Sequence, residues 1–279
     1  MKKTILSLFL LLSVLTLFSA INVAVSIVPQ KTFVEAVGKD LVNVTVIIPP
    51  GYSPSNYAPT ARQIVNFSKS AVYFTIGVPA EESNILPKIA KNTPNVEIVH
   101  LEEEVDSVYP PRFFSNGGRD PHIWLSPKRS IVMISIIKDH LCSIDTQNCN
   151  DYIQNANEYI NELTQLDEEL KEKLSQVKNK GFFCYHPSFG YFADDYSLTM
   201  YALEENGKEA TSRRLTEMVE LAKKNDYKVI FYQAEIDSSQ TESFAQEIGG
   251  KALQLDPLSP DYLNNLGKMG QIFLEVLGE

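Results

Sequence analysis

Short apolar segments alternate along most of the chain with longer segments in which apolar positions recur every three or four residues. The short segments are rich in Val, Ile, Phe and Tyr, which is typical of buried strands. They occupy residues 22–28, 42–48, 71–76, 95–101, 181–185, 198–203, 228–233 and 251–255. Helix-like segments lie at 31–37, 60–68, 80–91, 211–224, 240–248 and 261–277. This alternation predicts an α/β fold with parallel sheets that are covered by helices on both faces.

The middle of the chain has a different pattern. Residues 150–179 are almost free of turn signals, with neither Gly nor Pro, and their apolar positions recur in steps of three and four. The pattern predicts one amphipathic helix that is roughly 40 Å long. A coiled-coil dimer is the competing interpretation, but it does not account for the α/β pattern on either side. We expect two wound parallel-sheet lobes, 21–149 and 180–279, joined by one rigid helix and enclosing a ligand cleft at their strand ends.

The N-terminus indicates export from the cytoplasm. Lys2 and Lys3 precede an uncharged apolar segment, residues 5–20, which is typical of a secretory signal peptide. A helix of that length reaches about 24 Å, which is short for a hydrocarbon core of about 30 Å. Phe18 lies where signal peptidase prefers a small residue, so an uncleaved N-terminal anchor remains an alternative. Either way we expect an extracytoplasmic protein, in the periplasm or on the outer cell surface.

Charge and cysteine content narrow the function. The chain has 25 basic and 35 acidic residues, so its net charge of −10 disfavours binding to nucleic acid. Cys142 and Cys149 bound a short loop that could close as a local disulfide in an oxidising compartment. We expect Cys184, inside an apolar segment, to be a buried and inert thiol.

Four candidate metal ligands follow predicted strands or precede a helix. His186 and Asp256 each end a predicted strand. Glu235 comes two residues after Gln233, which ends another strand. His122 lies in a loop before a helix that begins near residue 126. Two imidazoles and one or two carboxylates can hold a divalent transition metal, provided that these distant positions converge. Structural roles are the alternative, because a strand-end His is usually hydrogen-bonded and an Asp before Pro often caps a turn.

The remaining two histidines are expected to have structural roles. His100 comes at the end of a strand before an acidic run, and His140 lies on a helix face beside Asp139.

Four motifs in order then resemble the zinc/manganese-type (cluster A-I) solute-binding proteins of bacterial and archaeal ABC uptake systems. They are IPPGYSPSNY, HIWLSP, HPSFGYF and LDPL, and they begin at residues 48, 122, 186 and 255. The resemblance covers the chain after the signal segment and implies two α/β lobes joined by one long helix. It also implies that His122, His186 and Asp256 are metal ligands.

The sequence departs from this pattern at one ligand. The family usually has its first His where this chain has Ser55, and it often has Glu where this chain has Gln233. Residues i and i+2 share one face of a strand, so we expect Glu235 to point into the same cleft and to replace the absent His. The short segment 102–118 contains no His, so the metal-gathering loop of some zinc-specific members is missing.

We therefore expect a monomeric carrier of Zn²⁺, with Mn²⁺ or Fe²⁺ as alternatives, that delivers its cargo to an ABC permease driven by an ATPase. Two imidazoles with two carboxylates form an oxygen-rich set that suits Mn²⁺ or Fe²⁺, whereas Zn²⁺ has the higher intrinsic affinity. A binder of a metal chelate or small organic ligand is one alternative. A secreted metallohydrolase is another, although the chain has no HExxH motif, nucleophile elbow or glycine-rich phosphate loop. We do not expect an enzyme.

Overall fold

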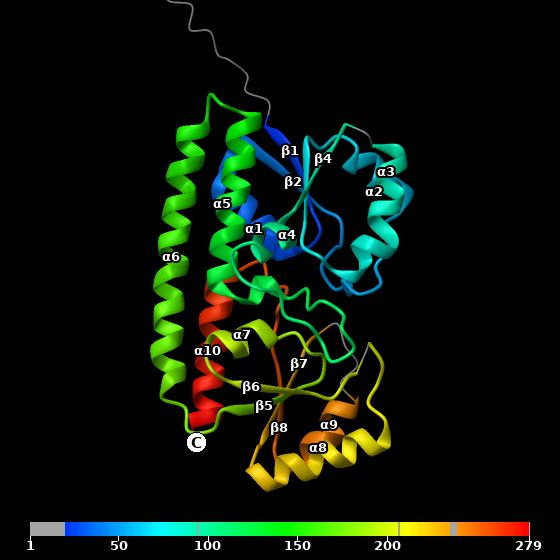
Figure 1. Ribbon diagram of the computed structural model, residues 1–279, viewed down its shortest axis with the longest axis vertical. Coiled ribbons are helices and arrows are strands. Elements are labelled where there is room, and N and C mark those ends of the chain that lie inside the picture. The colour runs from blue at the N-terminus through cyan, green and yellow to red at the C-terminus, as the bar shows by residue number, and fades with distance from the viewer. Residues whose placement is uncertain (1–19, 94, 206, 235–238, 279) are drawn as a thin grey trace, which may run out of the picture.

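The computed structural model describes residues 20–278 except 94, 206 and 235–238, and within this part it shows two four-stranded parallel sheets (Figure 1). The first sheet, in the order β2-β1-β3-β4, contains β1 (Ile21–Val25), β2 (Val42–Val46), β3 (Val72–Thr75) and β4 (Glu97–His100). The second sheet, in the order β6-β5-β7-β8, contains β5 (Gly181–Cys184), β6 (Thr199–Ala202), β7 (Val229–Tyr232) and β8 (Lys251–Gln254). The predicted wound α/β class is confirmed, and each sheet reverses its strand order beside its first strand, which is where ligands bind in this class.

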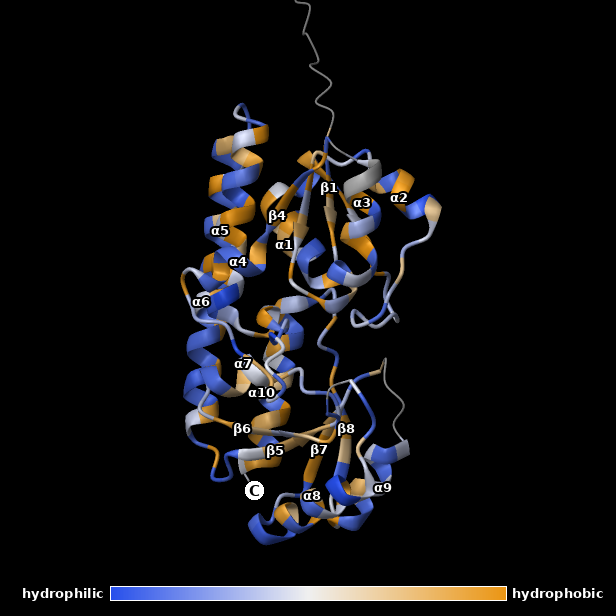
Figure 2. Ribbon diagram, turned by 45° about the vertical axis from the view of Figure 1, so that its right-hand side comes forward, coloured by the Kyte–Doolittle hydropathy of each residue, from blue (hydrophilic) through white to orange (hydrophobic). Residues whose placement is uncertain are grey.

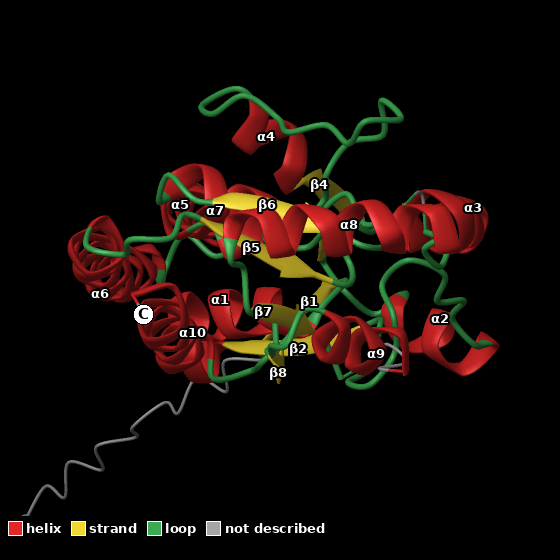
Figure 3. Cartoon of the chain, turned by 90° about the horizontal axis from the view of Figure 1, so that it is seen from below, coloured by secondary structure: helices red, strands yellow, loops and turns green. Residues whose placement is uncertain are grey.

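Helices cover both faces of each sheet. They are α1 (Val28–Gly38), α2 (Ala61–Phe67), α3 (Leu86–Asn92), α4 (Leu101–Asp106), α5 (Pro127–Ile144), α6 (Cys149–Ser175), α7 (Gly190–Asp195), α8 (Ser212–Asn225), α9 (Ser239–Glu247) and α10 (Tyr262–Gly278). Helices α5, α6 and α10 gather on one side of the molecule (Figure 3), while α2, α3, α8 and α9 lie on the opposite side of the sheets (Figure 1). The central strands β1, β3, β5 and β7 are largely buried between helix layers, and β1 and β7 are mostly coloured hydrophobic in Figure 2.

Helix α6 is the long connecting helix that the periodicity predicts. It packs against α1 and α5 of the first lobe and against α10 of the second, so one element contacts both lobes. Its buried residues Tyr152, Leu163 and Leu170 follow the helical period. Gly270 of α10 faces Leu170 so closely that a Cβ atom would overlap the leucine side chain, which explains the glycine. The lobe boundaries expected from sequence, 149 and 180, remain a prediction.

The predicted disulfide is present and joins Cys142 near the end of α5 to Cys149 at the start of α6. Cys184 is a free and buried thiol, as expected. Residues 1–19, and with them the expected signal segment, lie outside the described part of the chain. No helix among the described residues is both long and apolar enough to cross a membrane.

Three details differ from the expected elements. The helix expected at 80–91 begins as a π-helical turn, Glu81–Ile85, before α3, because Pro87 has no N–H with which to continue one regular ladder. The six-residue helices α4 and α7 were not expected, since neither is long enough to show a helical period.

A buried carboxyl group connects the ends of β1 and β3. Glu81 accepts hydrogen bonds from the backbone N–H groups of Ile76 and Gly77, at 3.0 and 2.7 Å, and contacts the Ser26 hydroxyl, which is 2.6 Å from the Tyr73 hydroxyl. Burial, followed by the negative charge of Glu102, raises the pKa of Glu81 to about 8. The folded protein therefore keeps this carboxyl group protonated near neutral pH.

The raised pKa of Glu81 predicts a pH dependence of stability. Between about pH 4.5 and about 8 the folded state holds a proton that the unfolded state has lost, so the free energy of unfolding falls as pH rises through this window. We expect Glu81→Gln to remove this fall, which amounts to a few kcal/mol. Thermal melts of chelator-treated protein across this window measure it. Glu82→Gln, at the exposed neighbouring position, is the control, and an unchanged pH slope in Glu81→Gln would contradict the assignment.

Candidate metal centre in the interlobe cleft

A cleft of about 760 Å³ opens between the two lobes at the carboxyl ends of their strands. Its walls come from both lobes and include Ser55, Val78, His122 and Trp124 on one side and His186, Glu204, Gln233, Pro257 and Leu258 on the other. Segments from distant parts of the sequence therefore meet where the wound-sheet rule places a ligand.

His186 reaches the cleft from the strand beside which the second sheet reverses its order. It follows β5 by two residues, and its Nδ1 lies 2.9 Å from Oε2 of Glu204. Glu204 follows β6, and its backbone N–H donates to the carbonyl of Tyr185 at 2.9 Å, which continues the parallel register beyond the strand ends. Sheet pairing thus holds the carboxylate beside the imidazole.

His122 reaches the cleft from the loop between α4 and α5. Its backbone N–H and its Nδ1 both lie within hydrogen-bond distance of Oδ1 of Asp120, at 3.0 and 2.7 Å. Asp120 is fully buried, and its second oxygen lies 3.4 Å from Nε of Arg112. A buried carboxylate with a guanidinium behind it therefore fixes the orientation of this ring.

The two rings approach each other through their other nitrogens. Nε2 of His122 lies 3.3 Å from Nε2 of His186, and both Nδ1 atoms face carboxylates. A His122 ring that donates its Nδ1 proton to Asp120 directs the lone pair of its Nε2 toward His186. Desolvation by burial lowers the pKa of His122, so the protonated form of this ring is disfavoured.

The separation of these two nitrogens suits a shared metal ion. Two nitrogens bound to one tetrahedral Zn²⁺ at about 2.0–2.1 Å lie about 3.3 Å apart. Imidazoles whose second nitrogen donates to a carboxylate are the usual arrangement around protein-bound zinc. The structure thus brings together two of the four sequence-predicted residues in a form that favours a cation between them.

The other two predicted residues are placed differently. Asp256 is exposed, and its Oδ1 accepts a hydrogen bond from the backbone N–H of Leu258 at 3.1 Å, as a turn cap does. Within the described part of the chain no carboxylate forms a three-residue group with His122 and His186 inside 4.8 Å. Glu235 lies outside the described residues. The assignment of all four as ligands stays a prediction.

Two positions that differ from the family pattern lie in the cleft wall. Ser55 is exposed there and carries the hydroxyl group that stands in the place of the family's first imidazole. Gln233 is buried at the end of β7 and donates a hydrogen bond to the Ser188 hydroxyl.

Sequence reasoning missed the two orienting carboxylates and the arginine. Asp120 stands only two residues before His122, and this short spacing is the sequence signal for its contact with the ring. Glu204 could have been found from the parallel neighbour of β5, since both strands end at the same edge. The pairing of Arg112 with Asp120 depends on the path of a loop, which no local pattern indicates.

A family model described as zinc-uptake complex component A, periplasmic (ZnuA), matches residues 23–274. The chain belongs to this family. The family is one of solute-binding proteins rather than enzymes, in agreement with the absence of the hydrolase motifs considered above.

Known proteins of this kind align with most of the chain. A crystal structure of ZnuA superposes with a TM-score of 0.87 at 31% identity, covering 92% of this chain and 99% of that one. The zinc-binding lipoprotein AdcA of Streptococcus pneumoniae is 27% identical over 255 residues, which are 85% of this chain and 50% of AdcA. The chain thus spans about half the length of this curated relative. The periplasmic zinc-binding protein TroA of Treponema pallidum shares the fold, with a TM-score of 0.85 at 16% identity over 94% of this chain and all of that one.

The carboxylate behind His186 gives a first test of the site. Glu204→Gln removes the charge that holds the Nδ1 proton, so we expect zinc affinity to fall by about 10–100-fold. Competition titrations against a chromogenic zinc chelator measure the change. Glu205→Gln is the matched control, because Glu205 lines the same cleft but is exposed and faces Arg214 rather than a histidine. Equal affinities of the two variants would show that Glu204 does not support the site.

Proposed function

We propose that this protein captures Zn²⁺ in the interlobe cleft and delivers it to an ABC-type importer. The observation that carries the proposal is the facing pair of Nε2 atoms, 3.3 Å apart, in His122 and His186. Membership of a family described by zinc uptake supports the choice of cargo.

The proposed ligand set adds Glu235 and Asp256 to the two imidazoles. The turn that carries Asp256 is anchored beside His122, because the indole N–H of Trp124 donates to the carbonyl of Pro257 at 2.8 Å. Glu235 stands two residues after the cleft-lining Gln233, which comes directly after β7. These oxygens would complete the coordination that Ser55 leaves short of one imidazole.

Zinc is the cargo that we favour, with Mn²⁺ and Fe²⁺ as the alternatives. Carboxylate oxygens suit all three ions, but zinc outranks the other two in affinity for a mixed nitrogen and oxygen site. The paired imidazoles strengthen this preference, because imidazole nitrogen is a better ligand for Zn²⁺ than a hard oxygen atom is.

The cleft is held nearly in its working shape before the ion arrives. The backbone N–H of Arg112 donates to the hydroxyl of Tyr191 on α7, and this hydroxyl donates to the carbonyl of Asp120, at 2.8 and 3.1 Å. The Arg112 guanidinium also pairs with Asp194 of α7 at 2.6 Å. Because these contacts join the His122 loop to the second lobe and α6 spans both lobes, we expect a small closure on binding.

Delivery requires an extracytoplasmic protein and a membrane partner. The apolar N-terminal segment 5–20 supports export, as a cleaved signal peptide or a retained anchor. The partner would be an ABC permease with its ATPase, met by a monomeric carrier. Protons compete with the metal for both imidazoles, so an acidic environment promotes release.

Metal binding by the isolated protein tests the proposal. We expect a tight equivalent of Zn²⁺ that stabilises the protein by about 2.7 kcal/mol at a free concentration of one hundred times the dissociation constant. Replacing His122 or His186 with Ala should remove most of this stabilisation, because the cleft then loses one of its two facing imidazoles. His140→Ala serves as control, since His140 pairs with Glu97 away from the cleft. Stabilisation only by zinc together with a small carboxylate chelator would instead indicate a chelate binder.

The two proposed carboxylate ligands can be tested separately. Glu235→Gln and Asp256→Asn keep the side-chain size and remove a charged oxygen, so each should weaken zinc binding without changing the thermal stability of the metal-free protein. Isothermal calorimetry of both variants measures the effect. Asp261→Asn, at another exposed acid near the same turn, is the matched control. Unchanged affinity in either ligand variant would remove that residue from the set.

A further inference from the structure

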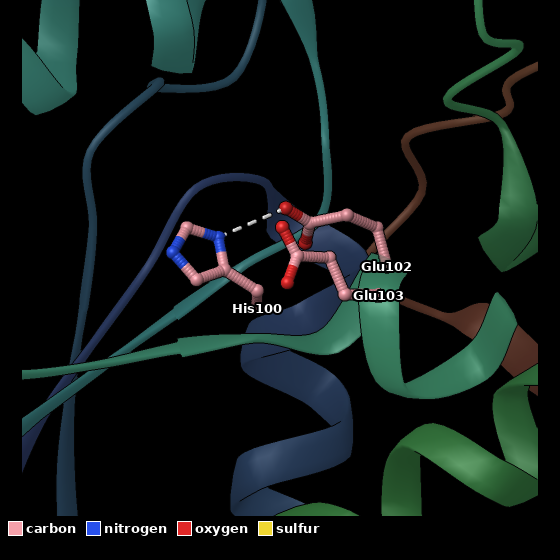
Figure 4. A group of neighbouring side chains, drawn as sticks. All are labelled: His100, Glu102 and Glu103. Atoms are coloured by element: carbon pink, nitrogen blue, oxygen red, sulfur yellow. Dashed lines mark hydrogen bonds and ion pairs between the residues drawn. The ribbon is translucent and has the colours of Figure 1, made fainter. Parts of the chain in front are cut away.

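A second group of metal-ligating side chains lies at the end of β4, outside the cleft. His100 is the last residue of β4, and Glu102 and Glu103 belong to the first turn of α4 (Figure 4). One potential ligand atom from each lies within 4.8 Å of the others, and no other such group of three is found among the described residues. These three residues are not among those that line the cleft.

A buried hydroxyl group holds part of this cluster in place. Thr75, which is fully buried at the end of β3, lies 2.8 Å from Oε2 of Glu102 and 3.1 Å from Nδ1 of His100. Nδ1 of His100 lies 3.1 Å from Oε1 of Glu102. Figure 4 shows the Glu103 carboxylate beside the same imidazole. Two ligands are therefore positioned by the sheet, and the third is free to adjust because Glu103 is exposed.

The carboxylates of Glu102 and Glu103 form no ion pair with a lysine or arginine side chain within 4.0 Å among the described residues. Arg119, the neighbouring cation, pairs with Asp106 at 2.8 Å and reaches only the backbone carbonyl of Glu102. The negative charge of Glu102 also acts on the buried Glu81, where it is the second cause, after burial, of the raised pKa.

We propose that His100, Glu102 and Glu103 form a second divalent metal site at the rim of the first lobe. The separation of 3.1 Å between Nδ1 of His100 and Oε1 of Glu102 is close to the edge of a zinc tetrahedron, about 3.3 Å. One imidazole and two carboxylates form a mixed set that accepts Zn²⁺, and water would complete the shell. With fewer protein ligands and a His100 side chain that is 39% exposed, this site binds more weakly than the cleft and exchanges faster.

The position of the cluster suggests a purpose for such a site. Arg119 lines the cleft and donates to the backbone carbonyl of Glu102, so one residue contacts both places. An ion held here would lie beside a residue of the cleft wall. The arrangement raises the local metal concentration beside the tight site in a chain that has no histidine-rich loop.

Metal stoichiometry of the full chain, measured with Zn²⁺ alone, tests the proposal. We expect two equivalents in the wild type, one tight and one weak, by calorimetry and by metal analysis after equilibrium dialysis. His100→Ala and Glu103→Gln should each lose the weak equivalent and keep the tight one. Glu104→Gln, which removes an exposed charge at the next position of α4, should keep both.

The cleft variant separates this proposal from the proposed function. His122→Ala should lose the tight equivalent and keep the weak one. A wild type that binds a single equivalent would overturn the second site and leave the cleft proposal intact. A weak equivalent that survives in both His100→Ala and Glu103→Gln would overturn it as well. Glu103→Gln shows that a lost equivalent does not result from misfolding, because Glu103 is exposed and its replacement leaves the packing of the sheet unchanged.

Discussion

The geometry of the cleft depends on how the His122 loop is attached to the opposite lobe. The loop lies between α4 and α5 of the first lobe, yet its polar contacts through Arg112 and Asp120 are made with Tyr191 and Asp194 of α7. Tyr262 of α10 adds a further tie, because its hydroxyl contacts both Ser130 and the carbonyl of Trp124. Without these contacts nothing would fix the position of the loop, and the His122 imidazole would not be held against the His186 imidazole of the other lobe.

A different structural feature fixes the orientation of each imidazole of the pair. The orientation of His186 follows from sheet register, since Glu204 is the neighbour that parallel pairing places beside it. The orientation of His122 follows from a local turn in which Asp120 accepts from both the backbone and the ring. The sheet gives one donor a rigid position, and the buried aspartate gives the other a fixed tautomer. Their convergence brings the two Nε2 atoms to 3.3 Å, a separation that suits two ligands of one metal ion.

The sequence predicts the elements well because they depend on local periodicity. The eight described strands fall within or beside the short apolar segments, the long helix α6 follows the three-to-four spacing, and the motif order indicates the family. The helices of six residues and the π-helical turn before Pro87 escape such reasoning, since they have no period of their own. His186 and Asp256 both follow strands, as the sequence indicates. The direction of the Asp256 carboxylate, which accepts from the backbone N–H of Leu258, depends on a turn that the strand pattern does not predict.

The disulfide and the proposed metal centre lie at opposite ends of the same helix, α5. His122 precedes α5, and Cys142 comes fifteen residues after Pro127, a helical distance of about 22 Å. Closing so short a loop stabilises the fold by about 2 kcal/mol in the chain-entropy picture. A reductant that opens this bond therefore loosens the far end of the helical hairpin and leaves the donor atoms untouched. Reduction would therefore lower the stability of this end of the fold and leave the positions of the two imidazoles unchanged.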